Sequence, residues 1–254
     1  MSALWNIGAA VLTALPAICR IAWDLKWHGA LQREFQVHKT APIPPAASTP
    51  PAGIRSPDLD GITLIVCSHN DLALLQSNWD LWRGQQFPDH WSAEWLVVDD
   101  GSEDGTAEWL APLAANDAQL TVVRHSKTRP GKKDALAAGI MAARHECLVL
   151  TDADCKPQPH WARDMVEALT AETAENAPHR WDIALGVCLP DGGPALLTFD
   201  ALRVAFQYAG EAAAGRPYMG VGRNIAYRRS AWESLGGFDA HADLASGDDD
   251  LFVQ

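Results

Sequence analysis

The stretch that decides the fold reads WLVVDDGSEDGT and covers residues 95–106. A short apolar run ends in two aspartates, and Gly101 permits a sharp turn before a helix-like segment begins near Gly105. Short apolar runs that alternate with helix-like segments are typical of βαβ units. The same alternation recurs from Gly61 onward. The sequence therefore predicts an α/β fold with a mostly parallel sheet flanked by helices.

Five strands and five helices are predicted in alternation along this part of the chain, and no internal repeat is visible. The predicted strands are Ile62–Cys67, Trp95–Asp99, Leu120–Arg124, Cys147–Thr151 and Ile183–Cys188. The predicted helices are Leu72–Trp82, Gly105–Ala115, Lys132–Arg144, His160–Thr170 and Ala195–Ala214.

The N-terminal segment differs from the rest in composition. Residues Ala3–Cys19 carry no charge and are mostly apolar, and a bilayer span needs roughly 17 to 25 such residues. The cations that follow, from Arg20 to Lys39, would keep the downstream side in the cytoplasm. We expect residues 1–27 to form an apolar helix that anchors the chain to the cytoplasmic face of the cell membrane. A helix lying on the membrane surface and one packed on the soluble domain are the alternatives.

Two further segments follow the expected anchor. Residues 28–60 include six prolines between Ala41 and Pro57, a composition that favours an extended linker over a packed core. Residues 61–254 are then the remaining domain.

Composition limits the classes of partner. Asp and Glu number 32 against 20 Lys and Arg, so the net charge is -12. Broad binding to nucleic acid, which needs a dense basic surface, is therefore not expected. The five cysteines are scattered without a C-x-x-C pair, which favours reduced thiols over a zinc site or a redox couple.

Polar groups follow three of the predicted strands. Ser68 to Asp71 follow the first predicted strand, Asp99 and Asp100 end the second, and Asp152 and Asp154 come directly after the fourth. In an open α/β sheet ligands bind beyond the carboxyl ends of the strands. Two neighbouring carboxylates suit Mg²⁺ or Mn²⁺, which can bridge them to substrate phosphates. The alternative is that these acids are ordinary turn or helix-capping residues, with Ser102 or Asp104 as the N-cap of the helix that follows.

Two later segments also carry candidate site residues. Lys132 opens a predicted helix, where backbone N–H groups and an ammonium suit a phosphate, although a solvated basic loop is the alternative. Arg223 and Asn224 lie beside two glycines, which indicates backbone close to a ligand. Three consecutive acids, residues 248–250, should raise one another's pKa, so that one of them can accept a proton. A solvated loop or helix start is again the alternative.

Together these motifs resemble glycosyltransferase family 2, from Ile62 to the end of the chain. The motifs stand in the family's order: V-D-D-G-S-x-D-x-T, G-K-x-x-A-L, D-A-D, G-G-F-D and G-D-D. The resemblance implies a GT-A fold and an inverting transferase that uses a nucleotide-sugar, with UDP-sugars favoured. Many membrane-embedded members continue past the G-D-D motif, so this domain is expected to be incomplete at its C-terminus.

The resemblance also implies roles for individual residues. The nucleotide pocket would be formed by Ser68, Asp99, Asp100, Lys132 and Asp152. Asp152 and Asp154 would hold Mg²⁺ or Mn²⁺. Arg223 and Asn224 would shape the acceptor side, for a glycan or a lipid-linked acceptor. Asp249 would be the catalytic base, with Asp248 as the alternative because a one-residue shift in alignment exchanges them.

Two other functions are compatible with these residues. A sugar nucleotidyltransferase also uses an α/β fold and a metal, but the segment after the first predicted strand, residues 67–71, lacks a glycine-rich loop with an arginine. A non-catalytic, membrane-anchored nucleotide-sugar binding protein is the second alternative, which the acidic motif near residue 249 disfavours.

Overall fold

The computed structural model describes six stretches of the chain, which are residues 61–128, 131–170, 181–188, 190–192, 194–244 and 246–253. The segments expected to form the anchor and the linker lie outside them. The first strand begins at Gly61, where the predicted domain begins.

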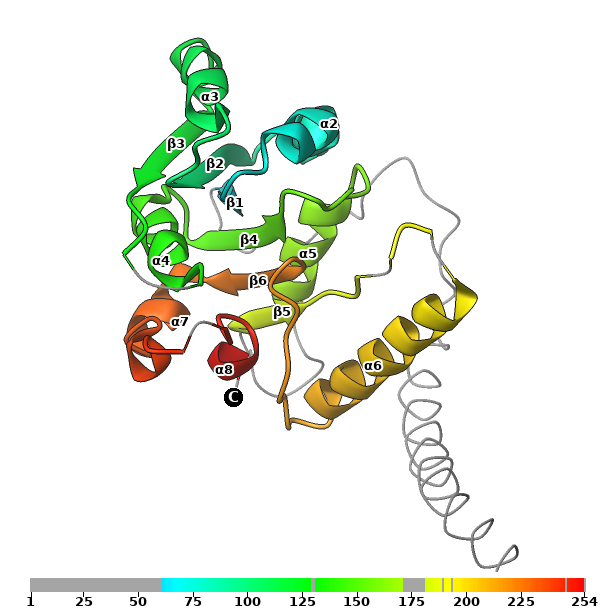
Figure 1. Cartoon of the computed structure of the whole chain (residues 1–254). Helices are drawn as coiled ribbons and strands as arrows, with labels where there is room; N and C mark the ends of the chain where they lie inside the picture. The colour runs from blue at the N-terminus through cyan, green and yellow to red at the C-terminus, as the bar shows by residue number, and fades with distance from the viewer. Residues whose placement is uncertain are drawn as a thin grey trace, which may run out of the picture.

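Six strands form one sheet in the order β3-β2-β1-β4-β6-β5 (Figure 1). Strands β1 to β4 pair in parallel, and β6 runs antiparallel to both of its neighbours. The predicted α/β architecture with a mostly parallel sheet is therefore confirmed. The strands are β1 Gly61–Ser68, β2 Ser92–Asp100, β3 Leu120–His125, β4 Cys147–Asp152, β5 Ile183–Leu185 and β6 Ile225–Arg228.

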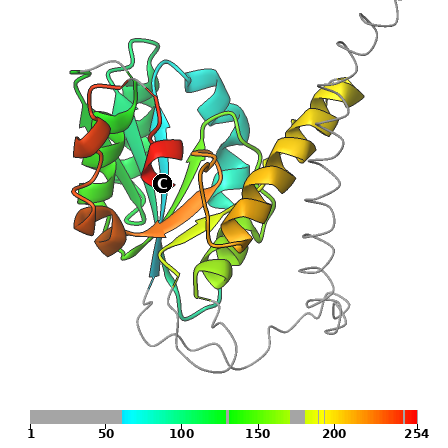
Figure 2. The same ribbon diagram turned by 90° about the horizontal axis from the view of Figure 1, so that it is seen from below.

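Helices cover both faces of the sheet (Figure 2). One core contains side chains of α2, α3 and α5 packed on alternate residues of β1 and β2, and the other contains α4, α7 and α8 packed on the opposite face. This division follows from the period of two in a strand, which sends successive side chains to opposite faces. The helices are α2 Leu72–Arg83, α3 Thr106–Ala115, α4 Lys133–Ala142, α5 Trp161–Thr170, α6 Ala195–Ala213, α7 Arg229–Ser234 and α8 Asp250–Val253, with a 3₁₀ turn over Asp239–His241.

The strand β6 was not predicted, and β5 is shorter than predicted. The apolar run of β6 has only three residues, Ile225 to Tyr227, and polar Asn224 and Arg228 flank it. Such a run is too short for an alternating pattern to be recognised. The predicted strand Ile183–Cys188 ends at Leu185, and the next backbone N–H, that of Gly186, donates to the Asn224 carbonyl at 2.9 Å.

The register of the parallel strands brings their polar ends together. Ser68 at the end of β1 lies opposite Asp99 of β2, and Asp100 lies opposite His125 of β3. On the other side of β1, Asp152 of β4 lies beside Cys67. Residues far apart along the chain thus share one rim, because parallel strands end at the same edge.

A buried carboxylate ties the opposite end of the sheet together. Glu94 is 1% exposed and accepts hydrogen bonds from the hydroxyls of Thr63 at 2.8 Å and Thr121 at 2.6 Å. The backbone N–H of Arg144, just after α4, donates to it at 2.8 Å, and the Arg144 guanidinium pairs with it at 3.1 Å. Because a buried charge must be paired and hydrogen-bonded, this network holds β1, β2, β3 and the end of α4 in one arrangement.

Helix α6 lies along the outer side of the sheet, beyond β5 (Figure 2). The hydroxyl of Tyr208 joins it to the chain after β5 by donating to the Gly186 carbonyl at 2.8 Å. Its first turns expose Leu196, Leu197 and Phe199. None of the described helices combines the length and apolar character needed to cross a membrane.

Candidate active site

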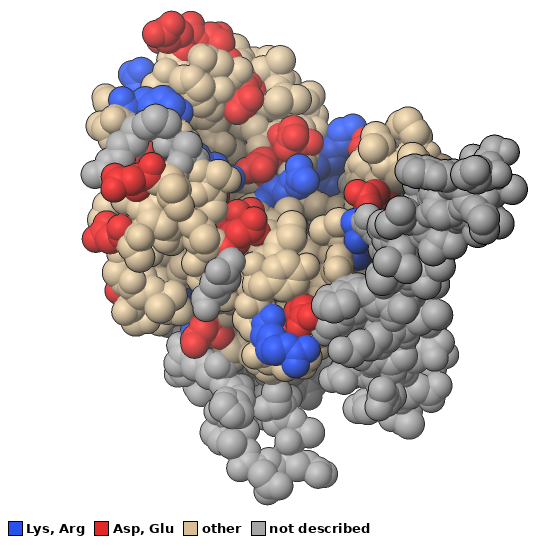
Figure 3. All heavy atoms as spheres, turned by 60° about the horizontal axis from the view of Figure 1, so that its bottom comes forward, with Lys and Arg blue, Asp and Glu red and all other residues tan. Residues whose placement is uncertain are grey.

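A cavity of about 470 Å³ opens at the carboxyl ends of β1, β2 and β4. Six of the ten predicted site residues line it, and four do not. The lining set is Ser68, Asp100, Lys132, Asp152, Asp154 and Asp248. Basic and acidic side chains lie close together around the hollowed part of this face (Figure 3). The remaining four are Asp99, Arg223, Asn224 and Asp249.

The residues at the ends of β1 and β2 are buried. Ser68 lines the cavity and is 1% exposed, and its buried hydroxyl has no hydrogen-bond partner in the described part of the chain. A buried hydroxyl normally has a partner, so Ser68 is available to a ligand. Asp99 accepts the N–H of Ser102 at 3.0 Å and lies 3.9 Å from the Arg124 guanidinium, so it shapes the turn beside the cavity.

The loops after β1 and β2 are locked to each other. Asn70 has a positive φ of 60°, and its N–H donates to the Ser102 hydroxyl at 2.9 Å. Asp104 accepts the N–H groups of Leu72, the first residue of α2, at 2.8 Å and of Thr106, the first residue of α3, at 3.1 Å. A hydrogen bond from the Thr106 hydroxyl is the main cause that lowers the pKa of Asp104. The N-cap residue of α3 is Gly105, and not Asp104 or Ser102 as expected, but Asp104 accepts the first backbone N–H of both helices.

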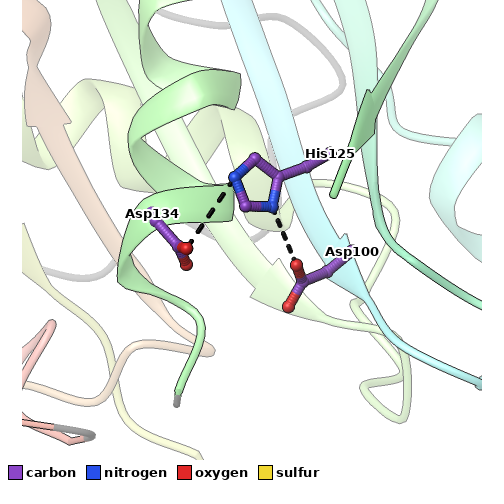
Figure 4. Close-up of side chains that lie close together, drawn as sticks. All are labelled: Asp100, His125 and Asp134. Atoms are coloured by element: carbon purple, nitrogen blue, oxygen red, sulfur yellow. Dashed lines mark hydrogen bonds and ion pairs between the residues drawn. The ribbon is translucent and has the colours of Figure 1, made fainter. Parts of the chain in front are cut away.

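Asp100 lies in a network of charged side chains (Figure 4). One carboxylate oxygen lies 2.9 Å from Nδ1 of His125, and the other accepts the Lys127 ammonium at 2.8 Å. His125 Nε2 lies 3.8 Å from Asp134 of α4. Ligand atoms of Asp100, His125 and Asp134 all lie within 4.8 Å of one another, a geometry that could hold a metal ion.

His125 and Lys127 were not among the predicted site residues. Their positions carried a usable signal, because they directly follow a predicted parallel strand whose end must lie beside Asp100. Of the cations in this connection, only Lys132 was predicted to bind a phosphate. Arg129 of the same connection lies outside the described residues.

Lys132 lies between two acids from distant parts of the chain. Its ammonium is 3.2 Å from Oδ1 of Asp152 and 3.2 Å from Oδ2 of Asp248. Burial by itself would lower the pKa of Lys132, but the attraction of these two carboxylates outweighs it and raises the pKa above its ordinary value. Asp154 also lines the cavity but is exposed. The predicted metal ligands and the predicted phosphate-binding lysine therefore share one site.

The three consecutive acids differ in their contacts. Asp248 faces the cavity, whereas Asp249 accepts the N–H of Gly222 at 2.7 Å and Asp250 accepts the N–H of Gly220 at 3.2 Å. Burial, followed by repulsion from Asp249, raises the pKa of Asp250. A Cβ atom at Gly222 would lie 3.2 Å from Asp249 and 3.3 Å from Asp248, so glycine lets this backbone approach the acids.

The two predicted acceptor-side residues have different environments. Arg223 is exposed, whereas Asn224 is 8% exposed. The Asn224 carboxamide accepts the Trp161 indole N–H at 2.8 Å and donates to the Val187 carbonyl at 3.0 Å. Asn224 therefore connects β6 to α5 and to the chain after β5, while Arg223 presents a cation on the surface beside them.

Two cysteines meet next to the cavity. Cys155 follows the D-A-D motif and Cys188 follows β5, and their thiols share a hydrogen bond. That bond, with a further contribution from nearby Arg223, lowers the pKa of Cys188 to about 7. The four cysteines in the described residues are all free thiols, as expected.

Comparison with known proteins identifies a family for most of the chain. The family model described as glycosyl transferase family 2 matches residues 63–235, which is more than half of the chain. An undecaprenyl-phosphate mannosyltransferase of Micrococcus luteus is 38% identical over 77 residues. That match covers 29% of this chain and 31% of the relative.

Solved structures show the same fold. A mannosyltransferase from Pyrobaculum calidifontis, PcManGT in complex with GDP-Man and Mn²⁺, has a TM-score of 0.58 at 24% identity, over 91% of this chain and 60% of that one. S. aureus TarS in complex with UDP-GlcNAc has a TM-score of 0.53 at 17% identity, over 76% of this chain and 52% of that one. The predicted GT-A fold is confirmed, and the chain spans only part of the length of these relatives.

Proposed function

The chain belongs to glycosyl transferase family 2, and from this premise we propose that it transfers a sugar from a nucleotide-sugar to an acceptor hydroxyl with inversion at the anomeric carbon. The observation that supports the proposal best is the single cavity lined by Ser68, Asp100, Lys132, Asp152 and Asp248. It combines an unpartnered hydroxyl, an ammonium and carboxylates, which are the groups that a nucleotide diphosphate and its metal require.

The residues at the D-A-D motif fit a divalent ion. Carboxylate oxygens of Asp152, Asp154 and Asp248 line one cavity, and a cation, the Lys132 ammonium, already lies between two of them. We propose that Asp152 and Asp154 hold Mg²⁺ or Mn²⁺. When bound, the ion would offset the negative charge that develops on the leaving diphosphate. We prefer this site to the cluster of Asp100, His125 and Asp134 because Asp152 and Asp154 form the D-A-D motif on which the resemblance to the family rests.

The proposed base is Asp249. The Asp248 carboxylate already pairs with the Lys132 ammonium at 3.2 Å. Asp249 has no cation partner among the described residues, and Gly222 orients it through its N–H. In the proposed displacement Asp249 takes the acceptor's hydroxyl proton, and the oxygen attacks the face opposite the phosphate. Arg223 and Asn224 are proposed to shape the acceptor side.

A UDP-sugar is the donor that we propose first. GDP-mannose is the second candidate, because the curated relative is a mannosyltransferase and PcManGT was solved with GDP-Man. The relative's name also supports a lipid-linked acceptor. Such an acceptor would suit the proposed arrangement of the chain, in which residues 1–27 anchor it to the cytoplasmic face of the membrane and residues 28–60 link this anchor to the GT-A domain.

The test is a product assay with radiolabelled UDP- and GDP-sugars, with and without Mn²⁺, followed by NMR assignment of the product anomer. We expect transfer only with the metal, inversion at the anomeric carbon, and loss of transfer in Asp249→Asn with donor binding retained. Full turnover in Asp249→Asn together with its loss in Asp248→Asn would reassign the base. Retention of configuration would refute the proposed displacement.

A further inference from the structure

The Lys132 ammonium occupies a confined position. It is 3.2 Å from Asp152 on one side and 3.2 Å from Asp248 on the other. A Cβ atom at Gly222 would lie 3.3 Å from its Nζ, so the backbone of this glycine closes a third side. The ammonium thus bridges β4 to the segment that precedes α8.

A divalent ion bound through Asp152 would compete with this ammonium. Both cations need the Asp152 carboxylate, and two positive charges a few ångströms apart repel each other. A nucleotide brings a diphosphate, which is a second acceptor for the ammonium. Lysine suits such an exchange because its charge sits on a flexible four-carbon stem.

We propose that Lys132 exchanges partners when the donor binds: it leaves Asp152 as the divalent ion arrives and pairs with the diphosphate instead. The inference rests on the proposed function, and it adds that metal and nucleotide bind cooperatively. The ion displaces the Lys132 ammonium from Asp152, and the diphosphate of the nucleotide gives this ammonium a new partner. By linkage, the nucleotide then tightens metal binding by the same factor as the metal tightens nucleotide binding.

The experiment measures free Mn²⁺ by electron paramagnetic resonance during titration of the protein, alone and with saturating UDP or GDP. For the unaltered protein we expect Mn²⁺ to bind at least about tenfold more tightly with nucleotide than without. Lys132→Met keeps the length of the side chain and removes its charge. In this variant we expect Mn²⁺ binding without nucleotide to tighten about tenfold, and the gain from nucleotide to be smaller than in the unaltered protein, because only the direct attraction between the ion and the diphosphate remains.

Lys156→Met is the matched control. Lys156 lies two residues after Asp154 but pairs with exposed Asp191 and not with Asp152. This substitution tests whether removing any nearby positive charge tightens Mn²⁺ binding as the removal of Lys132 is expected to do. We expect Mn²⁺ binding close to that of the unaltered protein. Equal effects of the two substitutions would overturn the exchange. Circular dichroism establishes that each variant folds, and Lys132→Gln repeats the test should Lys132→Met not fold.

The outcomes separate this inference from the proposed function. Cooperative binding that survives unchanged in the Lys132 variants, or Mn²⁺ binding without nucleotide that weakens in them, overturns the exchange and leaves the proposed transferase intact. An unaltered protein that binds neither UDP nor GDP with Mn²⁺ overturns both.

Discussion

The packing of α4 on the sheet allows a prediction that can be worked out atom by atom. Gly139 faces β2, and a Cβ atom there would lie 2.5 Å from Val98 Cγ2, 3.3 Å from Leu96 Cδ2 and 3.6 Å from Ile65 Cγ2. Carbon atoms in contact are normally about 3.5 to 4.0 Å apart, so Gly139→Ala would require a shift of roughly 1 Å between the helix and the strand.

Two opposing effects set the size of the change. Overpacking of a close-packed core costs about 1 to 3 kcal/mol. Alanine in place of glycine inside a helix returns about 0.8 to 1.0 kcal/mol. We therefore expect Gly139→Ala to lower the free energy of unfolding by up to about 2 kcal/mol. Because Lys132 lies at the start of the same helix, we also expect weaker nucleotide binding.

The assay is urea denaturation of the full chain, followed by circular dichroism, in a double-mutant cycle with Val98→Ala. Val98 is fully buried, and its truncation removes the methyl that the new Cβ would strike. In the Val98→Ala background, Gly139→Ala should be neutral or stabilise by up to about 1 kcal/mol. The packing argument is refuted if Gly139→Ala costs the same in both backgrounds, or if it stabilises the chain that retains Val98.

Three further predictions concern side chains whose roles the tertiary structure reveals. Glu94→Gln should lower the free energy of unfolding by about 1 to 3 kcal/mol in urea denaturation. An amide NH₂ group would replace one of the two carboxylate oxygens and would then face a group that donates a hydrogen bond to Glu94. An unchanged midpoint would contradict this. Asn224→Ala should lower the melting temperature because it leaves the Trp161 indole N–H and the Val187 carbonyl without their partners, and an unchanged melting temperature would contradict this. Cys188 should be alkylated by iodoacetamide with a rate that rises through about pH 7 as its thiolate forms, well before Cys155 reacts, as peptide mass spectrometry can follow. Equal rates at pH 7 would contradict the assigned hydrogen bond.

The sequence was sufficient to predict the parallel part of the sheet. Apolar runs such as Ile62–Cys67 are long enough to mark buried strands, and the helices between them impose parallel pairing, so the polar strand ends had to meet at one rim. The acids expected there, Asp100, Asp152 and Asp154, line one cavity. The G-K motif also placed Lys132 correctly at the start of α4 and beside this cavity.

Other features depend on contacts that no local pattern records. Strand β6 is too short to be recognised alone and exists because β4 and β5 supply hydrogen-bond partners on both sides. Asp248 lines the cavity, whereas Asp249 accepts the N–H of Gly222. This difference between two neighbouring acids depends on how α8 packs. The pairing of Cys155 with Cys188 likewise follows from the closeness of the chain after β4 to the chain after β5.

The sequence by itself therefore determined the class of fold and the rim at which polar groups collect, because strand periodicity and strand ends are local properties of the chain. The family was indicated separately, by the resemblance of five motifs. Only the tertiary structure decided which partner each charged group has at that rim. Asp100 is held by His125 and Lys127, and Lys132 lies between Asp152 and Asp248. These pairings are set by distances between residues far apart in sequence, which spacing along the chain does not specify.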